Sequence, residues 1–431
     1  MSDLLLHDVE VVGRPGLDVR VADGRIAEVG PGLPRDGADV LPGHGGALLP
    51  GLHDHHVHLL AAAARAGSVD VSPAHAPDLD ALARLLASAA RDAGAARGTA
   101  AVRAVGYDDE ATGRIDAAFL DRAGAGTPIR VQHRGGHAWV LSSAGRPPGV
   151  TPDPDGWLHG AEALPPGDST PPAPGDVSRR LAAFGVTAVT DASPGNDPTT
   201  AALLAAVRQR VTLLGRAVPG APDKIMLEES ADWSLADVTD RIAAAHAEGR
   251  PVAVHCVSGA AVVFALTALD AAGGHPGDRL EHASVVDADL LPRLAASGLT
   301  VVTQPAFLHA RGDDYLARVD ARDVPGLYRV GSLLAAGIPV RGSSDTPFGP
   351  DDPWLAMATA VTRKTRDGAV IGPGERVTPE QALALYTGER AVRAGAPADL
   401  CLLHVPWRVA RVAPAADLVA ATLVAGRVVH P

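Results

Sequence analysis

The stretch from Pro50 to His58 reads Pro-Gly-Leu-His-Asp-His-His-Val-His, and it decides the fold of this chain. Leu48 and Leu49 lead into it, and the apolar entry predicts a β-strand. His56 and His58 are two residues apart, so on a strand they point to one face and offer two imidazoles to one metal ion. Histidines can also gather on a surface by chance. Four histidines within six residues favour the metal site.

Length and charge set the class of protein. The 431 residues fit a (β/α) barrel with an accessory domain. The net charge of −12, with no long basic cluster, argues against nucleic acid or an anionic membrane as partner and favours a small-molecule substrate. The first residues lack the pattern of a signal peptide and no apolar run of about 18 residues occurs, so we expect a cytoplasmic protein. The oligomeric state stays open, a homodimer included.

Cysteine and lysine are both scarce. Cys256 and Cys401 are the only cysteines, which indicates neither a disulfide framework nor a thiolate zinc cluster. Of the 38 basic side chains, only Lys224 and Lys364 are lysines. A lysine that persists among arginines marks a place where a guanidinium, which does not deprotonate, cannot act. We assign such a role to Lys224 and chance to Lys364.

The chain divides into terminal and central parts. Short strands punctuated by Gly and Pro fill residues 1–48, and similar strands return from Ala398 onward. We therefore expect a small β-sandwich domain built from residues 1–48 plus 385–431. Residues 49–384 would form the catalytic barrel, with an inserted loop region at about 127–176 that is too long for a simple connection.

The central part alternates strands with Ala-rich helices, which predicts an α/β fold. Eight strands are expected, the number that a (β/α)8 TIM barrel needs. Two of these strands end near His58 and Gly106. The other six lie at 186–191, 211–227, 252–255, 280–282, 300–304 and 340–345.

Three of these strands end on side chains that can bind a metal. His255, His282 and Asp345 stand at the carboxyl ends, where (β/α)8 enzymes carry their active sites. Each has a simpler interpretation, since a buried histidine is often only hydrogen-bonded and an aspartate often caps a helix. It is improbable that chance alone placed His255, His282 and Asp345 at strand ends in a chain that also carries His56 and His58.

At these residues the chain resembles the amidohydrolase superfamily, and within it the YtcJ-like branch, which is similar to N-substituted formamide deformylase. The resemblance spans nearly the whole chain. It rests on Pro50 to His58, Lys224-Ile225-Met226-Leu227, Val254-His255, Glu281-His282-Ala283, and Gly342-Ser343-Ser344-Asp345-Thr346-Pro347-Phe348.

The resemblance implies a divalent metal centre, with Zn²⁺ first and Mn²⁺ or Fe²⁺ as alternatives. His56, His58 and Asp345 would hold the more buried ion. His255 and His282 would hold the more exposed one.

Lys224, carboxylated by carbon dioxide, would bridge both ions. Burial near a cation favours this by lowering the lysine pKa. Pro219 to Asp223 precede Lys224, however, and place it near the start of a strand rather than at its carboxyl end. If Lys224 instead pairs with Asp223 or Glu228 at the surface, the site would hold one ion and His282 would polarise the substrate.

Either arrangement predicts hydrolysis of a C–N bond in an amide, an N-substituted formamide or a cyclic amide. A bound ion lowers the pKa of water to about 7, which supplies metal-activated hydroxide. Asp345 would take the proton and pass it to the leaving nitrogen, and His282 would assist. The alternatives are a mononuclear-metal deaminase of the same superfamily and a non-catalytic barrel scaffold.

The substrate contacts follow from position alone. We expect them among aromatic and polar side chains after the strands and in the inserted region. The candidates are Tyr107, His137, Trp139, Gln304, Phe307, Arg311 and Phe348.

Overall fold

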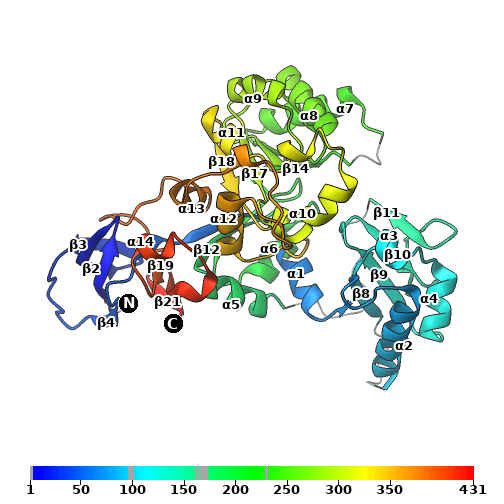
Figure 1. The fold of residues 1–431 in the computed structure, drawn as a ribbon, viewed down its shortest axis with the longest axis horizontal. Helices are drawn as coiled ribbons and strands as arrows, with labels where there is room; N and C mark the ends of the chain where they lie inside the picture. Colours follow the sequence, from blue (N-terminus) through cyan, green and yellow to red (C-terminus); the bar gives the residue numbers. More distant parts are fainter. Residues whose placement is uncertain (1–2, 96–100, 161–163, 165–172, 229–231) are drawn as a thin grey trace. The chain divides into compact units, whose positions relative to one another are not determined.

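The computed structural model describes residues 3–95, 101–160, 164, 173–228 and 232–431, and it divides into two compact units. The first unit comprises residues 1–59 and 174–431, and the second comprises residues 60–173. The chain is mixed α/β throughout (Figure 1).

Two four-stranded sheets in the first unit come from the two ends of the chain. One has the order β3-β2-β1-β4 and the other β21-β20-β19-β5. Their strands are β1 (Leu4–Val11), β2 (Arg14–Ala22), β3 (Arg25–Gly30), β4 (Asp39–Pro42), β5 (Leu48–Pro50), β19 (Leu400–Leu403), β20 (Val419–Val424) and β21 (Arg427–His430). Both sheets contribute to one buried cluster that includes Leu6, Val19, Leu402 and Leu423. The chain ends are therefore held together by a shared apolar core.

The predicted histidine strand lies in a parallel three-stranded sheet with the order β13-β12-β6. A parallel five-stranded sheet follows in the order β14-β15-β16-β17-β18. The strands are β6 (Leu52–Val57), β12 (Val186–Asp191), β13 (Arg210–Leu213), β14 (Asp223–Met226), β15 (Val252–Cys256), β16 (Arg279–His282), β17 (Thr300–Thr303) and β18 (Val340–Gly342).

Backbone hydrogen bonds join the two parallel sheets at both of their edges. After β18, Asp345 N donates to His56 O at 2.9 Å, and His58 N donates to Thr346 O at 2.8 Å. At the opposite edge, Gly215 N donates to Pro222 O at 2.9 Å. The carboxyl ends of β6 and β18 are thus neighbours, which brings the predicted ligands of both segments together.

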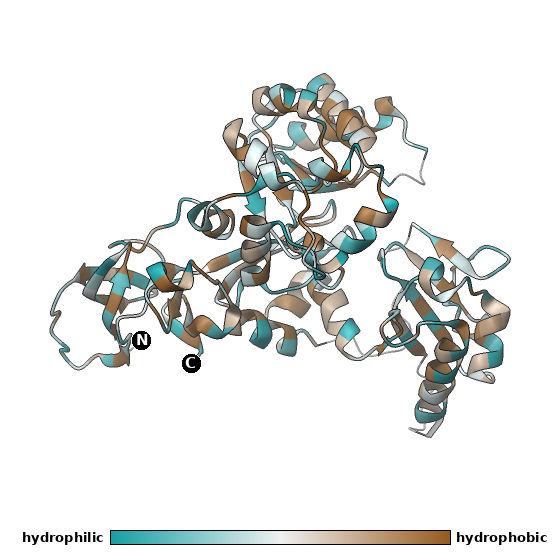
Figure 2. Cartoon of the chain, viewed as in Figure 1, coloured by the Kyte–Doolittle hydropathy of each residue, from teal (hydrophilic) through white to brown (hydrophobic). Residues whose placement is uncertain are grey.

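Helices alternate with the parallel strands, as a run of βα units requires. They are α5 (Gly175–Ala183), α6 (Pro198–Leu204), α7 (Leu235–Ala247), α8 (Gly259–Ala272), α9 (Leu291–Ser297), α10 (Ala306–Arg318), α11 (Gly331–Ala335), α12 (Pro353–Thr362) and α13 (Pro379–Thr387). Helix α14 (Trp407–Ala410) and short 3-10 helices at Ala288–Leu290, Val324–Gly326, Pro373–Glu375 and Ala416–Leu418 complete the unit. The apolar colour recurs along the strands and on the helices around them (Figure 2).

The second unit is a five-stranded sheet with its own core. Its order is β11-β10-β9-β8-β7. Its strands are β7 (Val69–Asp70), β8 (Val102–Tyr107), β9 (Ile129–His133), β10 (Ala138–Leu141) and β11 (Trp157–His159). Helix α1 (Leu59–Ala66) precedes the sheet in the chain. The other helices are α2 (Leu79–Ala95), α3 (Asp109–Thr112), α4 (Ala117–Gly124) and a 3-10 turn at Ser143–Gly145. Leu82, Leu86, Val131 and Trp157 lie in its buried cluster.

Two expectations about individual strands were wrong. The strand near Gly106 is β8, which pairs with β7 and β9 of the second unit rather than with the strands of the predicted metal ligands. The segment at 211–227 is two strands, β13 and β14, because the Gly and Pro residues at 215–222 interrupt it.

The loop region expected at about 127–176 holds β9 to β11. It belongs to a larger unit that begins at residue 60. Its residues 161–163 and 165–172 lie outside the described residues.

Candidate metal centre

The strand that carries the two histidines is held in place on both sides. Gly51 passes so close to Thr187 of β12 that any Cβ at this position would collide with the threonine side chain. Asp54 accepts from Ser344 N at 3.0 Å, which ties β6 to the segment after β18. Burial raises the pKa of Asp54 to about 7, against the lowering effect of its hydrogen bonds from Ser344 and His56. The Pro-Gly entry thus lets β6 pack tightly against both neighbours.

Three predicted ligands converge at the ends of β6 and β18. His58 Nε2 lies 3.2 Å from Oδ1 of Asp345, and His56 Nε2 lies 3.6 Å from the same oxygen. All three side chains are buried, and among the described residues they form a group whose ligand atoms lie within 4.8 Å of one another. A metal ion with bonds of about 2.1 Å separates neighbouring ligand atoms by roughly 3.0 to 3.5 Å, so the spacing fits one ion.

Two further predicted ligands border this group. The ring centroid of His282 lies 4.7 Å from that of His56 and 4.6 Å from that of His255. His255 is in β15 and His282 ends β16, so the five side chains come from four strand ends. His282 and Asp345 both adopt a positive φ, at 68° and 57°. Non-glycine residues in that conformation are uncommon, and they concentrate at functional sites.

Lys224 is a buried residue of the strand next to the one that carries His255. It is the second residue of β14, as the preceding Pro-rich run predicts, and it pairs with Ala253, two residues before His255 in β15. Its exposed fraction is 3%, so the surface pairing considered above is excluded. The pKa of His56 lies well below the ordinary value. Burial of His56 is the largest cause, and the charge of Lys224 is the second. The long side chain therefore ends near the histidines although its Cα lies early in the strand.

The other two histidines of the motif are not part of the group. The rings of His53 and His55 stack on one another with centroids 3.8 Å apart, and His53 Nε2 is 2.9 Å from Thr190 Oγ1. Burial, with the nearby charge of Arg390, lowers the pKa of His53 to about 3. Burial also lowers the pKa of His55 well below its ordinary value, so both rings are neutral at physiological pH.

Charge favours an ionised carboxylate facing neutral imidazoles. Burial would raise the pKa of Asp345, but that pKa lies below its usual value, and the hydrogen bond with His58 is the largest cause that lowers it. Burial lowers the pKa of His282. An anionic oxygen and neutral nitrogens are the protonation states in which these groups bind metal.

Several residues around the ligands were missed from the sequence. Glu281 accepts a hydrogen bond from His56 Nδ1 and is held in turn by Arg279, whose Nη2 is 3.0 Å from Oε2. Ser193 Oγ lies 3.1 Å from His58 Nδ1, and Asp191 accepts from Leu59 N at 2.8 Å. The signal was available for the first pair, because Arg279 and Glu281 are two apart on the strand that ends in His282.

Gln304, one of the predicted substrate contacts, is completely buried and bonded at both ends of its amide. Its Oε1 is 3.0 Å from His282 Nδ1, and its Nε2 donates to Ser343 Oγ at 2.9 Å. The side chain therefore contacts a predicted ligand directly.

The aromatic candidates in the first unit gather next to His58. The Phe348 ring is 5.4 Å from the His58 ring, edge to face. Arg311 donates to Phe348 O at 2.6 Å, and its guanidinium lies 4.6 Å from the centroid of the Phe307 ring. Phe307 stacks on Tyr328 with centroids 5.6 Å apart. This cluster is one wall beside the ligands.

The remaining candidates belong to the second unit. The Tyr107 hydroxyl donates to Gly113 O at 2.6 Å and accepts from Ile115 N at 3.0 Å within the core. Trp139 is buried in β10, with the Arg103 guanidinium 5.2 Å from its ring centroid, and His137 lies in the turn before β10. Their contact with a substrate stays a prediction.

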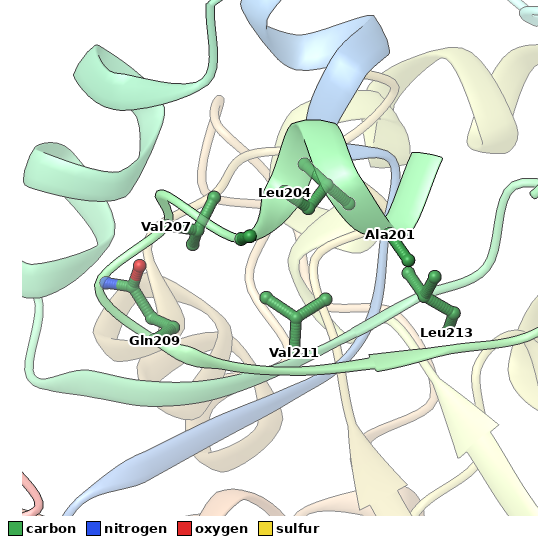
Figure 3. Close-up of a pocket in the computed structure, with 7 residues that line it drawn as sticks. Ala201, Leu204, Val207, Gln209, Val211 and Leu213 are labelled. Atoms are coloured by element: carbon green, nitrogen blue, oxygen red, sulfur yellow. The ribbon is translucent and has the colours of Figure 1, made fainter. Parts of the chain in front are cut away.

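A separate apolar groove lies between α6 and β13. Figure 3 shows the residues that line it, which are Ala201, Leu204, Ala205, Val207, Gln209, Val211 and Leu213. None of these lining residues is a predicted site residue. The candidate site is therefore defined by its ligands rather than by this groove.

Over the described parts of the chain, every helix is too short or too polar to cross a membrane.

Comparison with known proteins connects this geometry to a family. A model described as the amidohydrolase family matches residues 43–430. N-substituted formamide deformylase of Arthrobacter pascens is 30% identical over 187 residues, which cover 40% of this chain and 34% of that protein. YtcJ of Bacillus subtilis (strain 168), whose name assigns it provisionally to the amidohydrolases, is 30% identical over 148 residues, 33% of this chain and 28% of that protein. The matched segments span about a third or less of these relatives.

Solved structures share the fold over most of the chain. An uncharacterized metal-dependent hydrolase from Pyrococcus furiosus superposes with a TM-score of 0.71 at 20% identity, over 92% of this chain and 97% of that one. An uncharacterized metal-dependent hydrolase from Pyrococcus horikoshii OT3 gives a TM-score of 0.67 at 17% identity, over 92% and 96%. At this identity the likeness concerns the fold.

Proposed function

The chain belongs to the amidohydrolase family, and on that premise we propose that it is a metal-dependent hydrolase acting on a non-peptide C–N bond of a small molecule. The bond is that of an amide, an N-substituted formamide or a cyclic amide, in line with the name of the Arthrobacter pascens relative. The observation that carries the proposal is the convergence of His56, His58 and Asp345 on one point with spacings that fit an ion.

The architecture that we propose is a (β/α)8 barrel. Its eight parallel strands are β6 and β12 to β18, and the hydrogen bonds at both sheet edges support closure. The two sheets from the chain ends would form the accessory β-sandwich, supported by their shared core. In such a barrel, the ligands at strand carboxyl ends share one mouth.

The donor set fits a divalent ion such as Zn²⁺, since two imidazoles and one carboxylate are ligands that zinc prefers. His56, His58 and Asp345 would hold the first ion. We propose that His255 and His282 hold a second ion, and that Lys224, carboxylated, joins the two. The burial of Lys224 near His56 and His282 supports this arrangement.

A bound divalent ion supplies a Lewis acid that polarises the carbonyl and lowers the pKa of water. The protein supplies the remaining chemistry. The low pKa of Asp345 keeps it ionised, so it can accept a proton from the attacking water and transfer it to the leaving nitrogen. His282 would act as a ligand of the second ion. Proton transfer at Asp345 is needed because an amine leaves poorly without protonation.

The substrate would lie against the wall formed by Phe307, Arg311 and Phe348. The contact of Phe348 with His58 supports this, because it brings an apolar surface to the edge of the ligand group. Tyr107, His137 and Trp139 stay proposed substrate contacts on the sequence argument alone.

The function is tested by assaying purified protein, loaded with Zn²⁺, Mn²⁺ or Fe²⁺, against N-substituted formamides, amides, cyclic amides and amino-substituted rings. We expect release of an amine and a carboxylic acid, and loss of that activity in His56→Ala. Release of ammonia from the ring substrates alone would indicate the deaminase. A protein that binds none of the metals, and whose His56→Ala variant keeps the same Tm with and without metal, would instead be a scaffold.

A further inference from the structure

A chain of hydrogen bonds behind His282 crosses the ends of three adjacent strands. His282 ends β16, Gln304 follows β17, and Ser343 follows β18. His282 Nδ1 is 3.0 Å from Gln304 Oε1, Gln304 Nε2 donates to Ser343 Oγ at 2.9 Å, and Ser343 Oγ donates to Thr303 O at 3.3 Å. Gln304, Ser343 and Thr303 have no exposed surface. Burial removes the side chains of Gln304 and Ser343 from water, and they bond to one another instead.

The number of hydrogen bonds sets the direction of this chain. Thr303 O accepts from Ser343 N at 3.0 Å, and the hydroxyl of Ser343 adds a second bond to the same carbonyl at 3.3 Å. In that orientation Ser343 Oγ accepts from Gln304 Nε2, and Gln304 Oε1 accepts from His282 Nδ1, which carries the hydrogen. With the amide reversed, Ser343 would donate to Gln304 Oε1 and its bond to Thr303 O would be lost, so the chain would make two side-chain hydrogen bonds instead of three.

We propose that Gln304 and Ser343 are positioning residues that hold His282 as the tautomer protonated at Nδ1, which leaves Nε2 as its free lone pair. The part of this inference that concerns metal rests on the proposed function, since Nε2 is then the only ring nitrogen able to bind an ion. Gln304 acts on the reaction through His282 rather than by touching the substrate.

The first test measures the tautomer in the metal-free protein. Nitrogen-15 NMR of histidine-labelled protein, with His282 assigned through His282→Asn, reports which ring nitrogen carries the hydrogen. We expect the Nδ1–H form in the natural protein and in Gln304→Glu, whose carboxylate still accepts. Gln304→Met, similar in size but without an acceptor, is expected to give the Nε2–H form or a mixture. An Nε2–H ring in the natural protein, or an unchanged spectrum in Gln304→Met, would overturn the proposal.

The second test measures metal binding by competition with a chromophoric chelator. We expect Gln304→Met and Ser343→Ala to weaken the binding of Zn²⁺ by His282 about 10- to 100-fold, and Gln304→Glu to stay within a few-fold of the natural protein. Equal losses in the Met and Glu variants would contradict a role through the acceptor oxygen. If the natural protein bound no metal, the proposed function would fail, while the NMR experiment would still decide the tautomer.

Discussion

The Nδ1 atom of His56 donates a hydrogen bond to Oε2 of Glu281, a carboxylate that is completely buried. Since a carboxylate only accepts, the hydrogen of the ring is fixed at Nδ1 and Nε2 is directed at Asp345. Burial would raise the pKa of Glu281, but the charge of Arg279 and the hydrogen bond from His56 outweigh it and hold the pKa well below the ordinary value. A carboxylate behind a ligand histidine orients the ring and increases its basicity.

Replacing Glu281 should therefore weaken metal binding and destabilise the fold for different reasons. Glu281→Gln leaves Arg279 without its carboxylate, and breaking a buried ion pair costs about 3 to 5 kcal/mol. We expect Zn²⁺ affinity to fall about 10- to 100-fold. The double variant Arg279→Met with Glu281→Gln removes both charges, so it should recover stability in urea unfolding without recovering affinity. Full recovery of both would indicate that Glu281 matters only for folding.

Asp345→Asn should remove activity while keeping the fold. The amide cannot accept the proton and is a poorer ligand, so we expect kcat/KM to fall about 10³-fold or more. Asp237→Asn, at an exposed position of α7, is the matched control and should stay within twofold. A mild effect of Asp345→Asn on kcat/KM would argue against proton transfer at this residue.

The bridging role proposed for Lys224 predicts how many ions the protein binds. Elemental analysis of Lys224→Gln should give one equivalent of metal where the natural protein gives two, because the bridging group is lost. Lys364→Gln is the matched control, as Lys364 is exposed and is the only other lysine. If the natural protein and Lys224→Gln bind the same number of ions, the bridging role is wrong.

The stability of the first unit should depend on Glu375 in a pH-dependent way. Burial would raise the pKa of Glu375. Hydrogen bonds outweigh burial and lower the pKa below 4.5. The carboxylate accepts from Ser332 N at 2.8 Å, from Ser332 Oγ at 2.7 Å and from Arg329 Nη1 at 2.7 Å. A depressed pKa stabilises the folded state above the unfolded pKa, and this contribution is lost as pH falls through the folded pKa. Glu375→Gln should therefore lose about 1 to 3 kcal/mol at pH 7 and progressively less below pH of about 4. Urea unfolding at pH 7 and at pH 3.5 to 4 measures this, and an equal loss at all pH values would contradict it.

Gly51→Ala should destabilise the fold because its Cβ would collide with Thr187. A small overpacking of this kind costs about 1 to 3 kcal/mol. Gly274→Ala, where an added Cβ meets nothing and φ is not positive, should be nearly neutral. Thr187→Ala combined with Gly51→Ala should recover part of the loss in thermal unfolding. Equal Tm values for Gly51→Ala and Gly274→Ala would show that β6 and β12 adjust freely.

Periodicity predicted elements well where the sequence repeats a local pattern. The Ala-rich helices expected between the strands include α7, and Ser234 caps it by accepting from Asp237 N at 3.3 Å. The strand near Gly106 has the apolar pattern of a barrel strand, yet it pairs in another sheet. A strand's residues determine that it pairs, but its partner depends on which segments the chain brings alongside.

The sequence by itself predicted the candidate ligand set, because metal chemistry admits few residue types and a two-residue spacing on a strand puts His56 and His58 on one face. It also determined the family. Only the tertiary structure decided that Lys224 is buried, that Glu281 and Gln304 fix the hydrogens of His56 and His282, and that residues 60–173 form a separate unit. Those relations join residues far apart in the chain, and hydrogen-bond direction depends on which atoms meet in space rather than on any pattern along the sequence.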